Sequence, residues 1–297
     1  MFKTVVVGLD GRSGGQDALA LARALASADT RIVAVHAYPY EIHPTRGSVG
    51  GFANAMEEEA EKSLAAWVGD SGVERRVIAD VSPARALHFV ADDLAADLIV
   101  VCACHRTTAG RIFLGDVART TLDAAHCMTA VAPAGYRDGA GRIERIGLGF
   151  NETPEAEAAL LVAERLAAQL GAGLQLCMAV PTATPFVPAN AYAIDWPGLL
   201  EADLTAARSA IDGRAASLSV PATTTVVNDS AGTALVELSE GVDLTVVGSR
   251  GWGAAKSVVL GSTSHRLAHE AHSPLLVVPA PAREASEPQH SESAAVA

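Results

Sequence analysis

The chain has 297 residues, of which 49% are apolar and only 4% aromatic, so its cores must be built mainly from Ala, Val and Leu. This length predicts two domains. A formal net charge of −12 would repel a phosphodiester backbone, which argues against a nucleic-acid partner. No run reaches the roughly 18 apolar residues of a membrane-spanning helix, and the first residues lack a cleavage site, so we expect a cytoplasmic protein without a membrane partner.

The first half alternates short β-branched runs with stretches of helical periodicity. Its Val, Ile and Ala runs are continuous, which is typical of parallel strands covered on both faces. We expect strands at residues 3–9, 31–37, 75–79, 97–102 and 128–132, and helices near 14–28, 53–68, 83–94 and 115–125. Strands that alternate with helices predict an open, doubly wound α/β sheet of five parallel strands.

The second half repeats the first. Similar segments recur at an offset of 141 to 146 residues. For example, "DLIVVCACH" at 97–105 is matched by "DLTVVGSRG" at 243–251. The repeat predicts strands near 143–149, 173–180, 222–227, 243–248 and 274–279. We therefore expect two tandem domains, at residues 1–134 and 142–280, joined by a Gly-rich and charged linker. The remaining residues, 281–297, have no apolar period and are expected to be disordered.

One crevice in each half is expected to bind a ligand. In doubly wound sheets, ligands bind beyond the carboxyl ends of the strands at the point where the strand order reverses. If the first and fourth strands meet there, the loop at 149–151 faces the stretch "GSRGWGAAKSVVLGST" at 248–263, and the loop at 8–10 faces the corresponding stretch of the first half.

The stretch at 248–263 carries a spaced motif of small residues: Gly248, two residues, Gly251, nine residues, Gly261 and Ser262. This spacing resembles the nucleotide-binding signature of the universal stress protein family, G-x2-G-x9-G-S/T. The resemblance extends over both halves and includes the first strand of each half and the closing "SPLLVVP" at 273–279. It implies a tandem member with the fold of the related adenine nucleotide alpha hydrolases, and it implies ATP as ligand, with or without Mg²⁺.

The resemblance also assigns roles to individual residues. It places Gly248 and Gly251 against the ribose and phosphates, and Gly261, Ser262 and Thr263 against the phosphates. Adenine would lie near Ala179 and Val180 at the end of the second strand, and the ribose near the loop from Gly149 to Asn151. Arg250 and Lys256 are further candidates for phosphate contacts, although neither occupies a defined motif position.

Physical chemistry supports this motif as a phosphate site. Glycines at 248 and 251 allow positive φ angles and a close approach of the backbone to a ligand. A helix that begins at residues 261–263 would direct its first N–H groups and its positive dipole end at anionic oxygens. The alternative is a Gly-rich turn in which Ser262 serves only as the N-cap of the helix.

The first half departs from the motif, because Cys102, Ala103, Cys104 and His105 stand where the second half begins its glycine pattern, and Asp116 stands in place of Ser262. Side chains there would fill the space of a ligand, so we predict a lost or altered site in the first half.

The acidic residue that follows the first strand shows the opposite pattern, because here the first half keeps the family's residue and the second half departs from it. Asp10 is present in the first half as in the family, whereas Asn151 replaces it in the second, which weakens any assistance to a divalent cation.

Two further groups of residues invite a metal or redox interpretation. The four cysteines, Cys102, Cys104, Cys127 and Cys177, lack the spacing of a zinc site, and we expect them to be structural. His265 and His269 are four residues apart but have no third ligand, so a role on the helix surface is favoured over a metal site.

These features lead to competing functional hypotheses. The leading one is a stress-response sensor or regulatory module that binds ATP mainly in its second half. The alternative is a structural or protein-interaction module of the same family without nucleotide. An enzyme is not expected, since neither a phosphate-binding G-x4-G-K-S/T loop nor a nucleophile elbow is present, although slow hydrolysis of ATP stays open.

The last strand of each half predicts how the halves associate. In the strand order that the resemblance to the universal stress protein family implies, "TAVAP" at 129–133 and "LLVVP" at 275–279 would lie at the sheet edge, where an apolar strand invites pairing with another strand. The resemblance also implies that these edges pair between units. We therefore expect the halves to pack as an internal dimer about a pseudo-two-fold axis, and whole chains to form a homo-oligomer, most simply a dimer.

Overall fold

The computed structural model describes residues 1–40, 50–69, 71–103, 115–123, 125–139, 141–181, 196–249 and 261–280. In the first half, strands β1 (Thr4–Gly8), β2 (Arg31–Tyr38), β3 (Glu74–Ala79), β4 (Leu98–Cys102) and β5 (Met128–Ala132) alternate with helices α1 (Ser13–Leu25), α2 (Gly50–Val68), α3 (Pro83–Asp93) and α4 (Asp116–Asp123). The predicted strands and helices are thus confirmed, with bounds that differ by a few residues. The tail at 281–297 lies outside the described residues.

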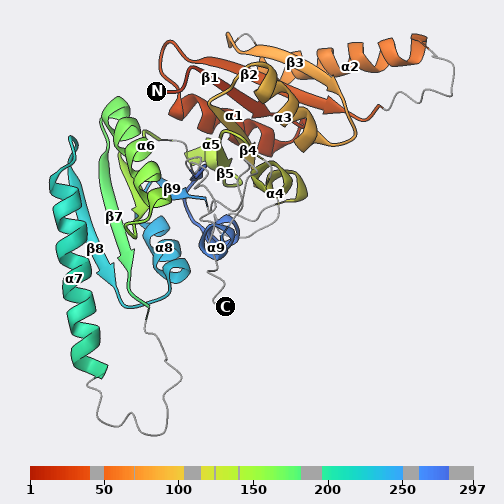
Figure 1. Cartoon of the computed structure of the whole chain (residues 1–297). Coiled ribbons are helices and arrows are strands. Elements are labelled where there is room, and N and C mark those ends of the chain that lie inside the picture. The colour runs from red at the N-terminus through yellow and green to blue at the C-terminus, as the bar shows by residue number, and fades with distance from the viewer. Residues whose placement is uncertain are drawn as a thin grey trace, which may run out of the picture.

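The second half repeats this order after a short helix, α5 (Tyr136–Gly139). It contains strands β6 (Arg145–Gly149), β7 (Gly173–Ala179), β8 (Ala222–Val227), β9 (Leu244–Gly248) and β10 (Leu275–Val278), together with helices α6 (Pro154–Leu170), α7 (Trp196–Ala216), α8 (Ala231–Glu240) and α9 (Ser262–Glu270). Figure 1 shows the two halves, coloured red to yellow and green to blue, meeting near α4, α5 and α9.

All these strands form one continuous sheet in the order β3-β2-β1-β4-β5-β10-β9-β6-β7-β8. Within each half the strands are parallel, and β1 lies beside β4 as β6 lies beside β9. The halves join where β5 and β10 pair antiparallel, with Leu276 opposite Ala130. The expected pairing of the apolar edge strands is confirmed, and it fuses the two expected sheets into one.

Two hydrophobic cores lie on opposite faces of this sheet. One packs α1, α2, α6 and α7 against the strands, and the other packs α3, α4, α8 and α9. Adjacent strand residues divide between them, so that Val5 and Val7 belong to the first core and Val6 to the second. Both cores continue across the β5–β10 junction, which explains why the strands of both halves read as unbroken apolar runs.

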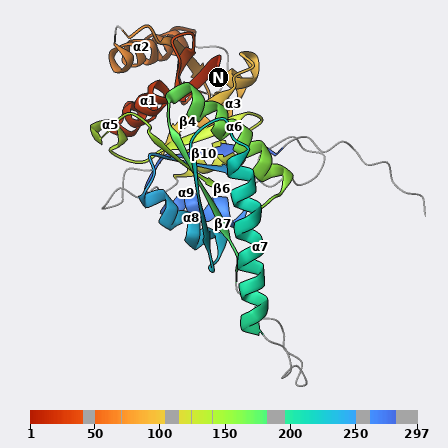
Figure 2. The same cartoon turned by 90° about the vertical axis from the view of Figure 1, so that its left-hand side faces the viewer.

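Helix α7 extends beyond the body of the molecule, as Figure 2 shows most clearly. Its buried residues, Ala207 and Ile211, lie toward its C-terminal end, whereas Trp196 and Leu199 near its start are exposed. Only the C-terminal part of this helix therefore belongs to the core.

The segment between the halves is partly ordered, although its composition predicts a linker. Asp17 of α1 is buried, and its carboxylate accepts hydrogen bonds from the backbone N–H groups of Gly135 (2.8 Å) and Arg137 (3.0 Å). A carboxylate that accepts the first N–H groups of a helix is a strong cap. Asp17 therefore anchors α5, and with it the start of the segment that connects the two halves, to helix α1 of the first half.

Candidate functional site

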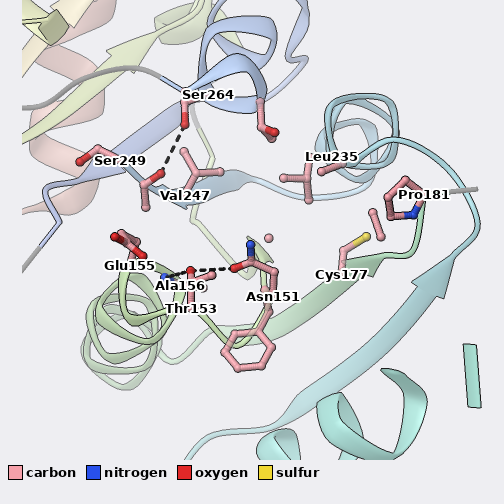
Figure 3. Close-up of a pocket in the computed structure, with 17 residues that line it drawn as sticks. Asn151, Thr153, Glu155, Ala156, Cys177, Pro181, Leu235, Val247, Ser249 and Ser264 are labelled. Atoms are coloured by element: carbon pink, nitrogen blue, oxygen red, sulfur yellow. Dashed lines mark hydrogen bonds between the residues drawn. The ribbon is translucent and has the colours of Figure 1, made fainter. Parts of the chain in front are cut away.

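A cavity of about 810 Å³ opens at the carboxyl ends of β6 and β9, where the strand order of the second half reverses. Figure 3 shows the side chains that line it. They come from both strand ends, from the first turns of α6, α8 and α9, and from the end of β7. The described lining residues are Gly149, Phe150, Asn151, Thr153, Glu155, Ala156, Cys177, Ala179, Pro181, Ala231, Leu235, Val247, Gly248, Ser249, Gly261, Thr263 and Ser264.

The cavity has two chemically different parts. Around β7 and α8 it is apolar, with Ala179, Pro181 and Leu235 in its wall. Around the ends of β6 and β9 it carries hydroxyl, amide and carboxylate groups, among them Thr153 and Thr263. An apolar part beside a few polar groups is the usual composition of a small-molecule site.

The structure brings together most of the residues assigned from the sequence. Gly149, Asn151, Ala179, Gly248, Gly261 and Thr263 all line the cavity. Val180 does not line it, because its N–H donates to the carbonyl of Val227 (2.8 Å) and its side chain packs against the first core. Ser262 is also absent from the wall and is exposed on the first turn of α9. Gly251, Arg250 and Lys256 lie outside the described residues.

The expectation of a positive φ angle is wrong for Gly248, which is not among the described glycines with that conformation. What requires glycine there is packing. A Cβ on Gly248 would lie 2.5 Å from the carbonyl oxygen of Glu155, on the first turn of α6. Gly149 is less strictly constrained on the other face of the sheet, where its Cβ would lie 2.5 Å from Cδ1 of Leu235, the end of a flexible side chain.

Helix α9 presents its N-terminus to the cavity. Its N-cap is Gly261, which offers no side-chain hydrogen bond, and the N–H of His265 donates to the carbonyl of Gly261 (2.8 Å). The expected role of Ser262 as the N-cap is therefore wrong, whereas the Gly-rich turn of that alternative lies outside the described residues. The hydroxyl of Ser264 donates to the carbonyl of Gly248 (3.3 Å), a bond drawn in Figure 3, and ties this turn to β9. The first N–H groups of an α-helix lack intrahelical partners and favour an anion.

Asn151 is held by the turn that starts α6. The hydroxyl of Thr153 donates to Oδ1 of Asn151 (2.9 Å) and also accepts from the N–H of Ala156 (3.3 Å), which makes Thr153 the N-cap. Glu152, between them, has a positive φ angle of 57°. Asn151 therefore reaches the cavity with its carbonyl oxygen already engaged, and its amide group can donate to a ligand.

The electrostatics of the wall contain a feature that motif reasoning missed. Glu155 is the only ionisable carboxylate among the described lining residues, and no Lys, Arg or His accompanies it there. The sequence could have indicated this residue, because Glu155 follows the loop after β6 at a position where the first half has Gly14.

The first half has a corresponding but much smaller cavity of about 140 Å³ at the ends of β1 and β4. Cys102 stands in its wall where the second half has Gly248, and Val117 stands where it has Thr263. Asp10 is also in the wall, and its carboxylate accepts from the N–H of Arg12 (3.0 Å). These differences agree with the predicted alteration of the first site. Cys104 and His105 lie outside the described residues.

Among the described cysteines, Cys127 and Cys177 are free thiols, and the thiol of Cys102 donates to the carbonyl of Ala103 (2.6 Å). Burial raises the pKa of Cys127 to about 12 and that of Cys177 to about 11. The described residues contain no group of three or more potential metal ligands. The rings of His265 and His269 on α9 lie 4.7 Å apart in a tilted arrangement, and burial together with the nearby His265 lowers the pKa of His269. Within the described residues, no helix is long and apolar enough to cross a membrane.

Comparison with known proteins agrees with this architecture. A curated relative, the universal stress protein in the QAH/OAS sulfhydrylase 3'region of Thermus aquaticus, is 33% identical over 135 residues, which are 43% of this chain and 96% of the relative. A universal stress protein structure from Archaeoglobus fulgidus DSM 4304 has a TM-score of 0.63 at 17% identity and covers 94% of this chain and 98% of its own. A functionally unknown protein from Pseudomonas aeruginosa PAO1 has a TM-score of 0.62 at 14% identity, with 94% and 93% covered.

The model of the universal stress protein family matches twice, over residues 1–133 and 142–279. Each matched segment contains the same strand order and a crevice at the same place, of about 140 Å³ in the first half and about 810 Å³ in the second. The chain therefore belongs to the universal stress protein family, as a tandem member with two copies of the family's domain.

Proposed function

We propose that this chain is a cytoplasmic nucleotide-binding protein of the stress response, which binds ATP in its second half and acts as a sensor or regulatory module. One observation carries the proposal: the cavity of about 810 Å³ joins an apolar part to the start of α9, whose N-cap makes no side-chain hydrogen bond. This volume lies in the range of about 300–1,000 Å³ that is usual for small-molecule sites.

The arrangement fits a nucleotide in one orientation. Adenine would lie against Ala179 and Leu235 in the apolar part, and the ribose near Asn151. The phosphates would then reach Thr263 and the first N–H groups of α9, where the helix dipole favours negative charge. The smaller cavity of the first half supports a single ATP site per chain.

A binding role is preferred to catalysis. Glu155 is the one carboxylate among the described lining residues, and no motif assigns it, or a base or nucleophile beside it, to the γ-phosphate, so any hydrolysis would be slow. Signalling by such a protein would depend on how strongly ATP shifts its conformational or assembly equilibrium.

The proposal is tested by the melting temperature with and without ATP. A ligand that binds only the folded state raises this temperature as its concentration exceeds the Kd. We expect a rise for the natural chain and adenine nucleotide in the purified protein. Absence of both results would reject the proposal and leave the family's structural or interaction role.

A matched pair of variants locates the site. Thr263→Glu places a carboxylate on the second residue of α9, within the large cavity, and Val117→Glu places one on the second residue of α4, within the small one. Acids are favourable in the first turn of a helix, so both variants should fold. Only Thr263→Glu should abolish the ATP-dependent rise, and an equal loss in both variants would contradict a site in the second half.

A second candidate function, the interaction module without nucleotide, is favoured by two residues in the wall of the large cavity. Glu155 places a negative charge in the cavity, and Asn151 replaces the acid of the first half. A carboxylate disfavours a free polyanion, and an amide in place of an acid lacks the charge that would assist a divalent cation.

A further inference from the structure

Glu155 is the acidic residue in the described wall of the large cavity. It is half-buried on the first turn of α6 and lines the cavity beside Gly248. The contact is close, since the position of a Cβ on Gly248 is 2.5 Å from the carbonyl oxygen and 3.2 Å from Cβ of Glu155. This end of β9 is where the proposed phosphates approach the sheet.

Among the described residues, no basic side chain compensates the charge of Glu155. Glu157, the other acid in this turn, pairs with the guanidinium of Arg214, with Nη2 and Oε2 2.9 Å apart. Glu155 forms no ion pair with any described residue, and the described wall of the cavity holds no basic side chain. Its carboxylate and the dipole of α9 therefore act in opposite directions on an anionic ligand.

We propose that Glu155 is the residue that selects ligands of this site by charge: it disfavours nucleotides in proportion to the negative charge of their phosphates. This inference rests on the proposed nucleotide site. It follows that the site holds ATP better when a divalent cation has neutralised part of the triphosphate, and that removing the carboxylate relaxes this requirement.

The test is the variant Glu155→Gln, which keeps the shape and removes the charge. Isothermal titration at low ionic strength compares adenosine, AMP, ATP in EDTA and ATP with Mg²⁺. Removing a negative charge a few ångströms from the phosphates in a partly solvated cavity is expected to tighten the binding of ATP in EDTA by about five- to tenfold. The affinity for AMP should rise by about two- to threefold, and the affinity for adenosine should not change. The gain should shrink in 0.5 M salt, because exposed charges are screened.

A matched control and a folding check accompany the variant. Glu152→Gln removes a neighbouring exposed carboxylate that does not line the cavity, and it should leave every affinity unchanged. Loss of an acid from the first turn of α6 should lower the melting temperature of Glu155→Gln by only about 1–3 °C.

The outcomes separate this inference from the proposed function. If ATP binds the natural chain and Glu155→Gln changes adenosine, AMP and ATP by one common factor, charge selection is wrong while the nucleotide site stands. The same holds if Glu152→Gln gives an equal effect. If no nucleotide binds either protein, the proposed function fails and the inference fails with it.

Discussion

The carbonyl oxygen of Glu155 lies 2.5 Å from the point that a Cβ on Gly248 would occupy. Real Cβ atoms do not approach a backbone oxygen so closely, and a carbonyl in the first turn of a helix cannot swing aside as a flexible side chain can. Gly248 therefore allows α6 to dock on the end of β9, and it belongs to the fold as well as to the motif.

Replacement of Gly248 by Ala should force these two elements apart. We expect Gly248→Ala to lower the free energy of unfolding by about 2–3 kcal/mol, as overpacking of a close contact does. Chemical denaturation measures this loss. Gly173→Ala in β7 is the matched control, because its Cβ would meet only the carbonyl oxygen of Pro221 at 3.7 Å, an ordinary contact. Equal losses in both variants would show that strand glycines matter for another reason.

The reason for this glycine could not be read from the sequence. Motif spacing predicts that glycine stands at 248 and suggests a positive φ angle, but the constraint comes from a helix more than 90 residues earlier in the chain. The first half has Cys102 at this position and Gly14 on its helix, the reverse distribution of small and large residues. Only the packed structure relates the two positions.

Asp17 should be important for stability although it lies far from the cavity. Its buried carboxylate accepts from the N–H groups of Gly135 and Arg137. Asp17→Asn directs an amide N–H₂ toward one of these donors, so we expect a loss of about 2–3 kcal/mol by chemical denaturation. Asp29→Asn, an exposed position on the loop after α1, is the control and should be neutral within about 0.5 kcal/mol. Equal small losses would contradict the anchoring of α5.

The thiols of Cys127 and Cys177 should be inert in the folded protein. Burial raises their pKa values to about 12 and about 11, so neither forms an appreciable amount of thiolate near pH 8. Peptide mapping after alkylation at pH 8 should find both unmodified in the folded chain and both modified in urea. Rapid alkylation of folded Cys177 would show that the cavity wall is open to solvent.

The same shifts have a consequence for stability against pH. The folded state keeps these two thiols protonated, whereas the unfolded state releases their protons above the ordinary thiol pKa of 9.0. The unfolded state then binds fewer protons, so this contribution to the free energy of unfolding is constant below about pH 8 and decreases as the pH rises through 9 and above. Replacing both cysteines by Ala should remove that part of the alkaline loss.

Sequence patterns predicted some features better than others. The strands were predictable because continuous Val and Ile runs have few alternatives, and the tandem repeat followed from self-similarity. The junction of β5 and β10 followed from their apolar composition together with the strand order that the resemblance to the family implies. Glu155 and the ordered α5 were not predictable, because their roles depend on which groups the folded chain brings beside them: Gly248 in one case and the carboxylate of Asp17 in the other.

Two fully buried threonines of the sheet provide a last, paired prediction. Thr245 of β9 shares a hydrogen bond of 2.8 Å with the hydroxyl of Ser273, whereas the hydroxyl of Thr129 in β5 has no partner among the described residues. Valine has the same shape without the hydroxyl, so Thr129→Val should stabilise the chain by about 0.5–1.5 kcal/mol and Thr245→Val should destabilise it by about 1–2 kcal/mol. Parallel denaturation curves measure both changes. Destabilisation by Thr129→Val would mean that its hydroxyl has a partner in solution, such as a buried water at the junction of the two halves.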